Sequence, residues 1–214
     1  MINMVFNGKR DFVLKAAINA LNNDCLKEEP FDAGLNHKVS CITVIELYRY
    51  KSLRELVDCL VRIKLGSPTA SVLLVNTKSQ LIPPLKSGAV SISASVLTWK
   101  RVLSTLKKGS PNIDYIVNEC FTLINRHHLS PKQNKVIDHL GEGMSLDEIA
   151  RHLCISVKAI YACISNASTK YGFLTNKKFQ SYILSETAAH DHSSISIIPP
   201  HLSTSDCVYF SSCA

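Results

Sequence analysis

The chain has 214 residues, 46% of them hydrophobic, and carries a formal net charge of +7. That length suits one or two domains, and the basic excess favours an anionic partner without identifying it. No apolar run reaches the roughly 18–20 residues that span a bilayer, and the first residues lack a signal-peptide pattern, so we expect a cytoplasmic protein.

Short apolar runs alternate with amphipathic segments along residues 1–110. The runs at 2–6, 39–45, 71–75 and 88–92 are typical of buried strands. Helical spacing appears at 12–21, 52–63 and 95–106, whereas residues 23–38 fit no clean element. This alternation predicts an α/β domain, a parallel sheet flanked by helices, over residues 1–110.

Two of the predicted helices carry further signals. Ser52 and Glu55 form the pattern of a capping box, and Gly109 is a C-terminal stop for the helix that starts at Ser95. We expect one side of the helix at 52–63 to be buried: Leu53, Leu56, Val57, Leu60, Val61 and Ile63.

Residues 111–128 predict a helix that links this domain to the next. Its apolar residues recur at helical spacing: Ile113, Ile116, Val117, Cys120, Phe121 and Ile124. At the other end of the chain, residues 186–214 are rich in serine and contain Pro199-Pro200, which predicts a disordered tail. The apolar residues Ile195, Ile197 and Ile198 leave open that the tail docks on the body or on a partner.

Residues 129–185 predict an all-α domain of four helices. Ser130, Pro131 and Gln133 start a helix by a cap, a first-turn proline and a capping box. Ser145 and Glu148 form a second capping box, Cys154-Ile155 makes a turn, and Ser156 caps a third helix, 157–171. Two helices joined by such a turn form a helix-turn-helix.

The third helix has two different sides. At ~100° per residue, one side carries Val157, Ile160, Ile164, Ala167, Ser168 and Tyr171. The other side is small or polar, as a helix that lies against base edges in the DNA major groove requires. We expect DNA contacts from Ser145, Lys158, Tyr161, Ala162, Ser165, Asn166, Thr169 and Lys170, with Lys177 and Lys178 also within reach of phosphates.

The alternative is a packing module whose polar side meets only water. Agreement between capping, turn and helix faces favours DNA binding. The net charge of +4 over residues 125–184, which hold eight basic and four acidic residues, favours it modestly.

Residues 129–184 resemble the helix-turn-helix of LuxR/FixJ-type bacterial transcription regulators. The matches include Leu129-Ser130-Pro131-Lys132, Gly143, Ser145, Glu148-Ile149-Ala150, Ile155-Ser156-Val157-Lys158, Ile160 and Gly172. The resemblance implies a dimer that binds the major groove through the third helix. The dimer contact would be the fourth helix, from Asn176 to about Leu184, with Phe179, Tyr182 and Ile183 as the residues in contact. Plain packing on the third helix is an equal alternative for these three.

Departures from this family lie in the third helix, and one of them, Tyr161, is at a position that reads bases in the family. Tyr161 stands where the family has lysine, and Cys163 where it has histidine. The target sequence therefore cannot be carried over. A partner-dependent interaction protein that modulates another regulator, with little DNA binding of its own, remains the alternative function.

Residues 88–109 resemble the last strand and helix of a response-regulator receiver, which makes residues 1–110 a degenerate receiver. A working receiver needs acidic residues for Mg²⁺, an acceptor aspartate and a lysine. This chain has Asn7-Gly8, Glu46, and Ser93 or Ala94 at those places. The resemblance therefore implies no phosphorylation chemistry.

Catalytic and metal-binding motifs are not evident. The chain has no P-loop, G-x-G-x-x-G, H-E-x-x-H or G-x-S-x-G pattern, so we predict no enzyme and no cofactor. The eight cysteines form no C-x-x-C pair and are expected as free thiols. A metal site of Cys207, Cys213, His190 and His192 is a minor alternative, because its spacing matches no zinc pattern. We predict a DNA-binding regulator that acts as a homodimer or heterodimer.

Overall fold

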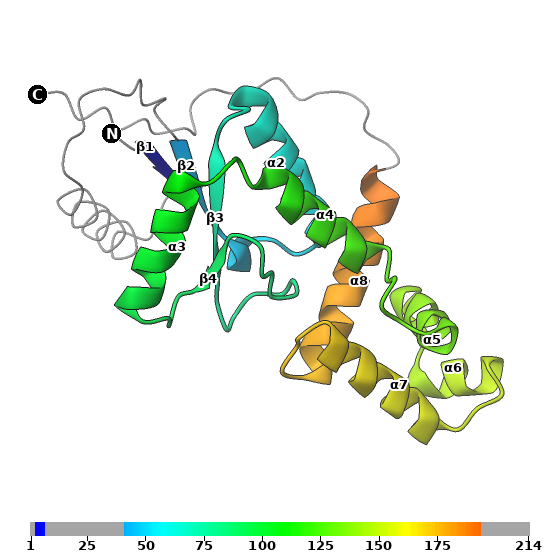
Figure 1. Ribbon diagram of the computed structural model, residues 1–214. Helices are drawn as coiled ribbons and strands as arrows, with labels where there is room; N and C mark the ends of the chain where they lie inside the picture. Colours follow the sequence, from blue (N-terminus) through cyan, green and yellow to red (C-terminus); the bar gives the residue numbers. More distant parts are fainter. Residues whose placement is uncertain (1–2, 7–40, 194–214) are drawn as a thin grey trace, which may run out of the picture.

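The structure, a computed structural model, describes residues 3–6 and 41–193 (Figure 1). The helix expected at 12–21 and the segment 23–38 lie outside the described residues, as does Asn7-Gly8. Within the described residues, the chain forms a sheet flanked by helices, followed by a bundle of helices at one end.

All described strands belong to one parallel sheet. Its order follows the sequence, β1-β2-β3-β4, and its register sets Val44 beside Leu73 and Val75 beside Val90. This confirms the parallel sheet predicted for the first half. The strands are β1 (Asn3–Phe6), β2 (Cys41–Glu46), β3 (Ser71–Asn76) and β4 (Ala89–Ser91).

Helices cover both faces of this sheet (Figure 1). Alternate residues of a strand point to opposite faces, so Val72 and Leu74 pack with α2 (Leu53–Gly66) and α4 (Ile113–Ile124). Leu73 and Val75 pack with α3 (Val96–Lys108), on the side of Trp99 and Leu103. Burial on both faces explains why the strands are continuous apolar runs without alternation.

The start of α2 differs in detail from the predicted capping box. The Ser52 hydroxyl accepts the Glu55 N–H at 3.1 Å, as expected. The Glu55 carboxylate instead accepts the Lys51 N–H at 2.8 Å, one residue earlier than a capping box requires. On the predicted apolar side, Val61 is 43% exposed, because the buried stripe narrows to Leu53, Leu56, Val57 and Leu60.

The crossover from β3 to β4, residues 77–88, contains no helix. Gly88 ends it at φ +64°, and a Cβ there would lie 2.3 Å from the Asn112 side-chain nitrogen. That amide bonds the Val72 N–H at 2.7 Å and carbonyl at 2.8 Å. Asn112 thus takes the place of a neighbouring strand beside Val72, and glycine makes room for it.

The link between the halves is shorter and more buried than expected. Helix α4 ends at Ile124 rather than 128, because Arg126 adopts a left-handed φ of 55°. Phe121, one of the apolar residues at helical spacing, is 44% exposed. Ile113, Ile116 and Cys120 are buried, however, so α4 belongs to the core beneath the sheet instead of forming a free linker.

The second half contains the four predicted helices: α5 (Pro131–Gly141), α6 (Leu146–His152), α7 (Val157–Lys170) and α8 (Asn176–Ser193). Helix α8 continues well past Leu184. The prediction of a disordered tail from 186 is therefore wrong for 186–193, where Glu186, Ala188 and Ala189 sustain a helix free of glycine and proline. Residues 194–214, including Ile195, Ile197 and Ile198, lie outside the described residues.

Candidate DNA-binding surface

The helix-turn-helix begins with the two capping boxes predicted from the sequence. Ser130 and Gln133 bond each other's backbone at the start of α5. At the start of α6, the Glu148 carboxylate accepts the Ser145 N–H at 2.8 Å, and the Ser145 hydroxyl accepts the Glu148 N–H at 3.3 Å. Hydrogen bonds from the Ser145 hydroxyl and N–H hold the pKa of Glu148 below its ordinary value.

The turn between α6 and α7 closes as a Schellman motif. Cys154 occupies the left-handed position with φ 52°, and its N–H bonds the Arg151 carbonyl at 3.3 Å. The next N–H, of Ile155, bonds the Ala150 carbonyl at 3.0 Å. Ser156 then caps α7 by accepting the Ala159 N–H at 3.2 Å. Cysteine thus stands where such a turn usually has glycine.

Helix α7 has the two-sided surface that the sequence predicts. Its inner residues Ile160, Ile164 and Ala167 are fully buried, and Ser168 and Tyr171 are nearly so. The α7 residues that the sequence predicts as DNA contacts are all exposed. Apart from Lys170, they follow one side of the helix: Lys158, Tyr161, Ala162, Ser165, Asn166 and Thr169. Ser145, at the start of α6, is also exposed. A polar helical face is therefore available to a partner.

The lysines near this face differ in what they contact. Within the described part of the chain, no hydrogen bond or ion pair holds the side chain of Lys158 or Lys177. Lys170 instead donates to the His128 carbonyl at 2.9 Å and to the Gln133 side chain at 3.0 Å. Lys178 donates to the Lys78 carbonyl in the first half. The exposed Lys158 ammonium is therefore available to a partner, whereas Lys170 fastens the α4–α5 link.

That link is packed on α7. The His128 ring lies edge-on to Tyr171, with centroids 4.6 Å apart. The Tyr171 hydroxyl donates to the Leu123 carbonyl at 2.8 Å. Burial, the Lys170 ammonium and His127 lower the pKa of His128, so its imidazole favours the neutral form. The C-terminal end of α7 is thereby fixed to the C-terminal end of α4.

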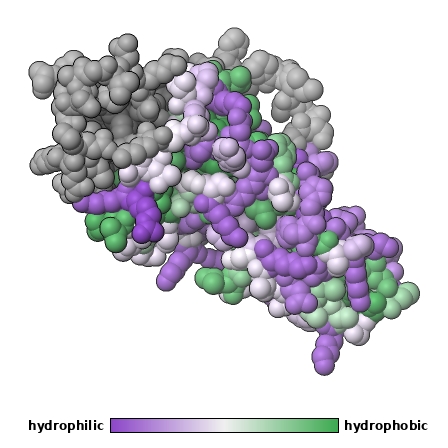
Figure 2. Space-filling view, in the orientation of Figure 1, coloured by the Kyte–Doolittle hydropathy of each residue, from purple (hydrophilic) through white to green (hydrophobic). Residues whose placement is uncertain are grey.

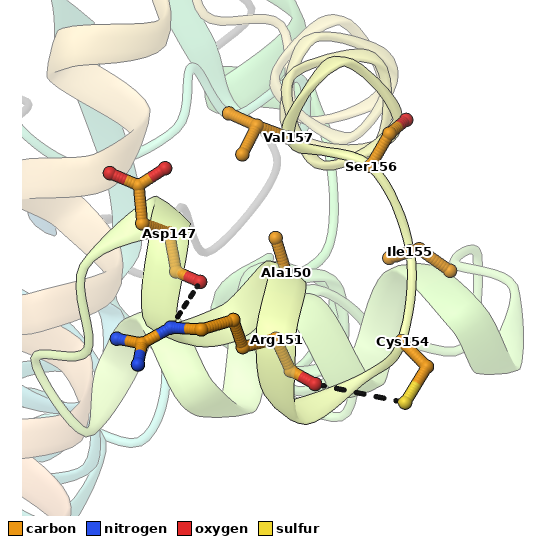
Figure 3. Close-up of a pocket in the computed structure, with 7 residues that line it drawn as sticks. All are labelled: Asp147, Ala150, Arg151, Cys154, Ile155, Ser156 and Val157. Carbon is orange, nitrogen blue, oxygen red and sulfur yellow. Dashed lines mark hydrogen bonds between the residues drawn. The ribbon is translucent and has the colours of Figure 1, made fainter.

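A groove of about 530 Å³ lies beside the turn between α6 and α7 (Figure 3). Figure 3 shows the Asp147 carboxylate pointing away from the Arg151 guanidinium, whose Nε donates to the Asp147 backbone carbonyl at 3.4 Å. Arg151 is exposed and shares this groove with Ser156 at the start of α7. It is a candidate phosphate contact that the sequence analysis missed, although its place in the last turn of α6 was a signal.

The predicted dimer anchors lie in the interior of the chain. Phe179 is 0% exposed, and Tyr182 and Ile183 are each 1% exposed. They pack in the same cluster as Tyr171. This matches the packing alternative, and a dimer through these side chains stays a prediction that would require α8 to leave its present neighbours.

The carboxyl end of the sheet carries no receiver-type acidic cluster among the described residues. Glu46 ends β2 and is half-buried. Ser93, one of the two candidates for the lysine position, bonds Ser91 through the hydroxyls at 2.9 Å. No group of three potential metal ligands exists in the described ranges, and Cys207 and Cys213 lie outside them.

Four cysteines in the described part of the chain form no disulfide: Cys59, Cys120, Cys154 and Cys163. Burial raises the pKa of Cys120 to about 12, so this thiol stays protonated. None of the helices in the described ranges is long and apolar enough to cross a membrane.

No protein-family model and no curated protein matches the chain. Solved structures do. A structure of two RcsB dimers bound to two parallel DNAs has 18% identity and a TM-score of 0.50, over 86% of this chain and 98% of that chain. This likeness shows a shared fold, in agreement with a sheet-containing half followed by a helical half.

Two further structures are similar at lower TM-scores. A complex of the two-component response regulator RcsB with DNA has 22% identity and a TM-score of 0.43, over 78% of this chain and 81% of that one. RcsB from Salmonella enterica serovar Typhimurium bound to the promoter rprA has 21% identity and a TM-score of 0.42, over 78% and 82%.

Proposed function

We propose that this protein is a sequence-specific DNA-binding transcription regulator of LuxR/FixJ type, which places α7 in the major groove. The exposed polar side of α7 supports the proposal most directly, since its opposite side is buried and its first turn carries an unpaired lysine among the described residues. The similarity to RcsB, whose structures include complexes with DNA, is consistent with it.

The residues divide into two roles in this proposal. Lys158 and Arg151 contact phosphates and position the helix, which carries no sequence information by itself. Tyr161, Ser165 and Asn166 face the base edges, where hydroxyl and amide groups can form hydrogen bonds and an aromatic ring can contact a thymine methyl. Ala162 keeps the helix surface low enough for close approach.

We propose that this regulator acts independently of phosphorylation. The reason is chemical: a half-buried glutamate and a serine stand at two of the positions where receiver chemistry needs an aspartate and a lysine. We propose instead that the first half acts as a folded partner of the DNA-binding half, with which it shares one hydrophobic core.

Dimeric binding is also part of the proposal, through a homodimer or a heterodimer with a related regulator. Helix-turn-helix dimers bind half-sites about one helical turn apart. Because Phe179, Tyr182 and Ile183 are buried, dimer formation through them would have to compete with the packing of α8 inside one chain.

Selection from a pool of genomic DNA tests the function. Fragments that bind the purified protein are sequenced and compared with those bound by Tyr161→Ala and Ser165→Ala. We expect enriched fragments that share a motif, and an altered motif for the two variants. Lys177→Ala, an exposed lysine outside α7, is the matched control and should keep the motif.

Selection that yields no enriched fragment would refute autonomous DNA reading. In that case the partner-dependent interaction protein becomes the better account, since the Tyr161 and Cys163 departures weaken the resemblance in α7. Repeating the selection with a co-purifying regulator present would then test that second function.

A further inference from the structure

A second cavity lies between the two halves of the chain, away from the exposed side of α7. It has a volume of about 330 Å³, within the roughly 300–1,000 Å³ of small-molecule sites. One wall follows the ends of β3 and β4, and the other is the turn between α7 and α8. Ligands of open parallel sheets bind outside the carboxyl ends of the strands, which is where this cavity opens.

The wall after β3 is held by a network of amide hydrogen bonds. Gln80, only 6% exposed, accepts the Thr77 N–H at 2.8 Å and donates to the Ile82 carbonyl at 3.2 Å. The Asn76 amide donates to the Leu85 carbonyl at 3.0 Å. These bonds fix the loop before any ligand arrives, which reduces the entropy cost of binding.

The opposite wall is equally fixed. Gly172 adopts φ +77°, and a Cβ there would lie 3.0 Å from the Pro84 ring, so the turn sits directly on the first half. The Phe173 ring packs against Phe179 and Tyr182, with centroids 5.8 Å and 5.5 Å apart. Leu174, next to it, is 83% exposed, and Figure 2 shows apolar patches set in the largely hydrophilic face of the described surface.

The chemistry of the lining selects a type of ligand. Two lysines, Lys78 and Lys178, contribute to it, and none of the described residues that line it is acidic. Ser91 and Ser93 add hydroxyls that bond each other, so one hydroxyl proton stays available. Lys178 uses one N–H on the Lys78 carbonyl and keeps two. Phe173 and Leu174 supply apolar surface.

We propose that this cavity binds a small organic anion, with a phosphate or carboxylate group attached to an apolar body. The anionic group meets Lys78, Lys178 and the serine hydroxyls, because ionised acceptors form the strongest hydrogen bonds with ammonium donors. The apolar body covers Leu174 and Phe173. Such a ligand contacts both halves of the chain and stabilises their packing on each other.

Nuclear magnetic resonance of the full ¹⁵N-labelled chain, without DNA, tests the site with phenyl phosphate as the probe. We expect saturable shifts of the Thr77, Ser93 and Leu174 amide signals. Benzyl alcohol, which lacks the anion, and inorganic phosphate, which lacks the ring, should bind at least about tenfold more weakly, since each loses one of the two recognition elements.

Two variants connect the binding to the lysines. Lys178→Gln and Lys78→Gln should each weaken phenyl phosphate about tenfold, the loss of one charge-assisted hydrogen bond. Lys78→Gln keeps the bond from Lys178 to the backbone carbonyl of residue 78, which joins the two halves. Weaker binding in this variant therefore reports the loss of the Lys78 ammonium and not a loss of packing between the halves. Lys177→Gln, whose lysine lies on the same helix outside the cavity, should bind like wild type.

Three results would overturn the proposal. These are no saturable shift at the cavity amides, equal binding of benzyl alcohol or inorganic phosphate, or wild-type affinity in both Lys178→Gln and Lys78→Gln. Shifts confined to α7 around Lys158 would likewise contradict it, because they would place the anion on the DNA-binding surface.

Discussion

At the scale of single residues, two lysines of one helix have different roles although both are exposed. Lys170 bonds the His128 carbonyl and the Gln133 side chain, whereas Lys158 has no such partner in the described ranges. We expect Lys170→Met to lower the free energy of unfolding by about 1 kcal/mol, the contribution of one or two partly exposed hydrogen bonds. Urea denaturation measures this, with Lys158→Met as the control that should leave stability unchanged.

Cys154 carries a second residue-scale prediction. Its φ of 52° costs a side chain roughly 1 kcal/mol, a penalty that glycine escapes. We expect Cys154→Gly to raise the free energy of unfolding by about 0.5–1 kcal/mol. Cys154→Ala keeps the strained backbone and removes the exposed thiol with its weak bond to the Arg151 carbonyl at 3.7 Å, so it should stay close to wild type. A gain of equal size in both variants would contradict the backbone explanation.

At the scale of elements, α8 joins the two halves through one buried carboxylate. Glu186, 7% exposed, accepts the Leu53 N–H at 2.6 Å and pairs with Arg54 at 3.3 Å. The bond supplies an acceptor at the start of α2, where helix N–H groups lack partners. We expect Glu186→Ala to cost about 1–3 kcal/mol, because it leaves that buried N–H without a partner. The midpoint of urea unfolding reports this loss.

The same carboxyl group predicts a pH dependence. Burial raises the pKa of Glu186 above its ordinary value near 4.5, against the lowering effects of the Leu53 N–H and Arg54. The folded chain therefore holds this proton more tightly than the unfolded chain. Its contribution to stability is complete below the ordinary glutamate range and is lost as pH rises through the raised pKa.

Denaturation from pH 4 upward measures the effect as a difference. Wild type should lose stability relative to Glu186→Gln as pH rises, because the amide does not ionise. The opposing contribution of His128, whose pKa is lowered, is the same in both chains and cancels. A difference that stays constant with pH would contradict the assignment to Glu186.

What the sequence could predict also differs between elements. The capping boxes at Ser130 and Ser145 and the two sides of α7 depend on local spacing, and all three are present. The burial of Glu186 depends on Leu53, 133 residues away in the chain, and no local pattern encodes such a contact. The same holds for Lys170, whose partners come from another helix and the link before it.

At the scale of the whole molecule, the two halves share one hydrophobic core. The cluster runs from Ile45 and Leu74 in the sheet, through Ile116 in α4, to Ile164 and Phe179 in the helix-turn-helix half. Continuous packing of this kind favours a single cooperative transition. We expect the two halves to unfold together instead of as independent domains.

The single tryptophan makes this testable. Trp99 lies on α3, in the cluster on the far side of the sheet from α8. Its fluorescence reports the first half, and far-ultraviolet circular dichroism reports mainly the helices of both. Their urea midpoints should coincide. Midpoints that separate would mean that the halves unfold independently.

The central claim, that α7 presents a DNA-binding face led by Lys158, is tested most directly by the salt dependence of binding. Fluorescence anisotropy gives the affinity of wild type, Lys158→Ala and the control Arg101→Ala, which removes an exposed cation of α3 in the first half, for one selected fragment over a series of salt concentrations. For Lys158→Ala, the slope of log affinity against log salt should become shallower by about 0.9, the loss of one phosphate contact. The control should keep the wild-type slope. A salt-sensitive complex whose slope is the same in all three proteins would contradict the account, because DNA would then bind elsewhere.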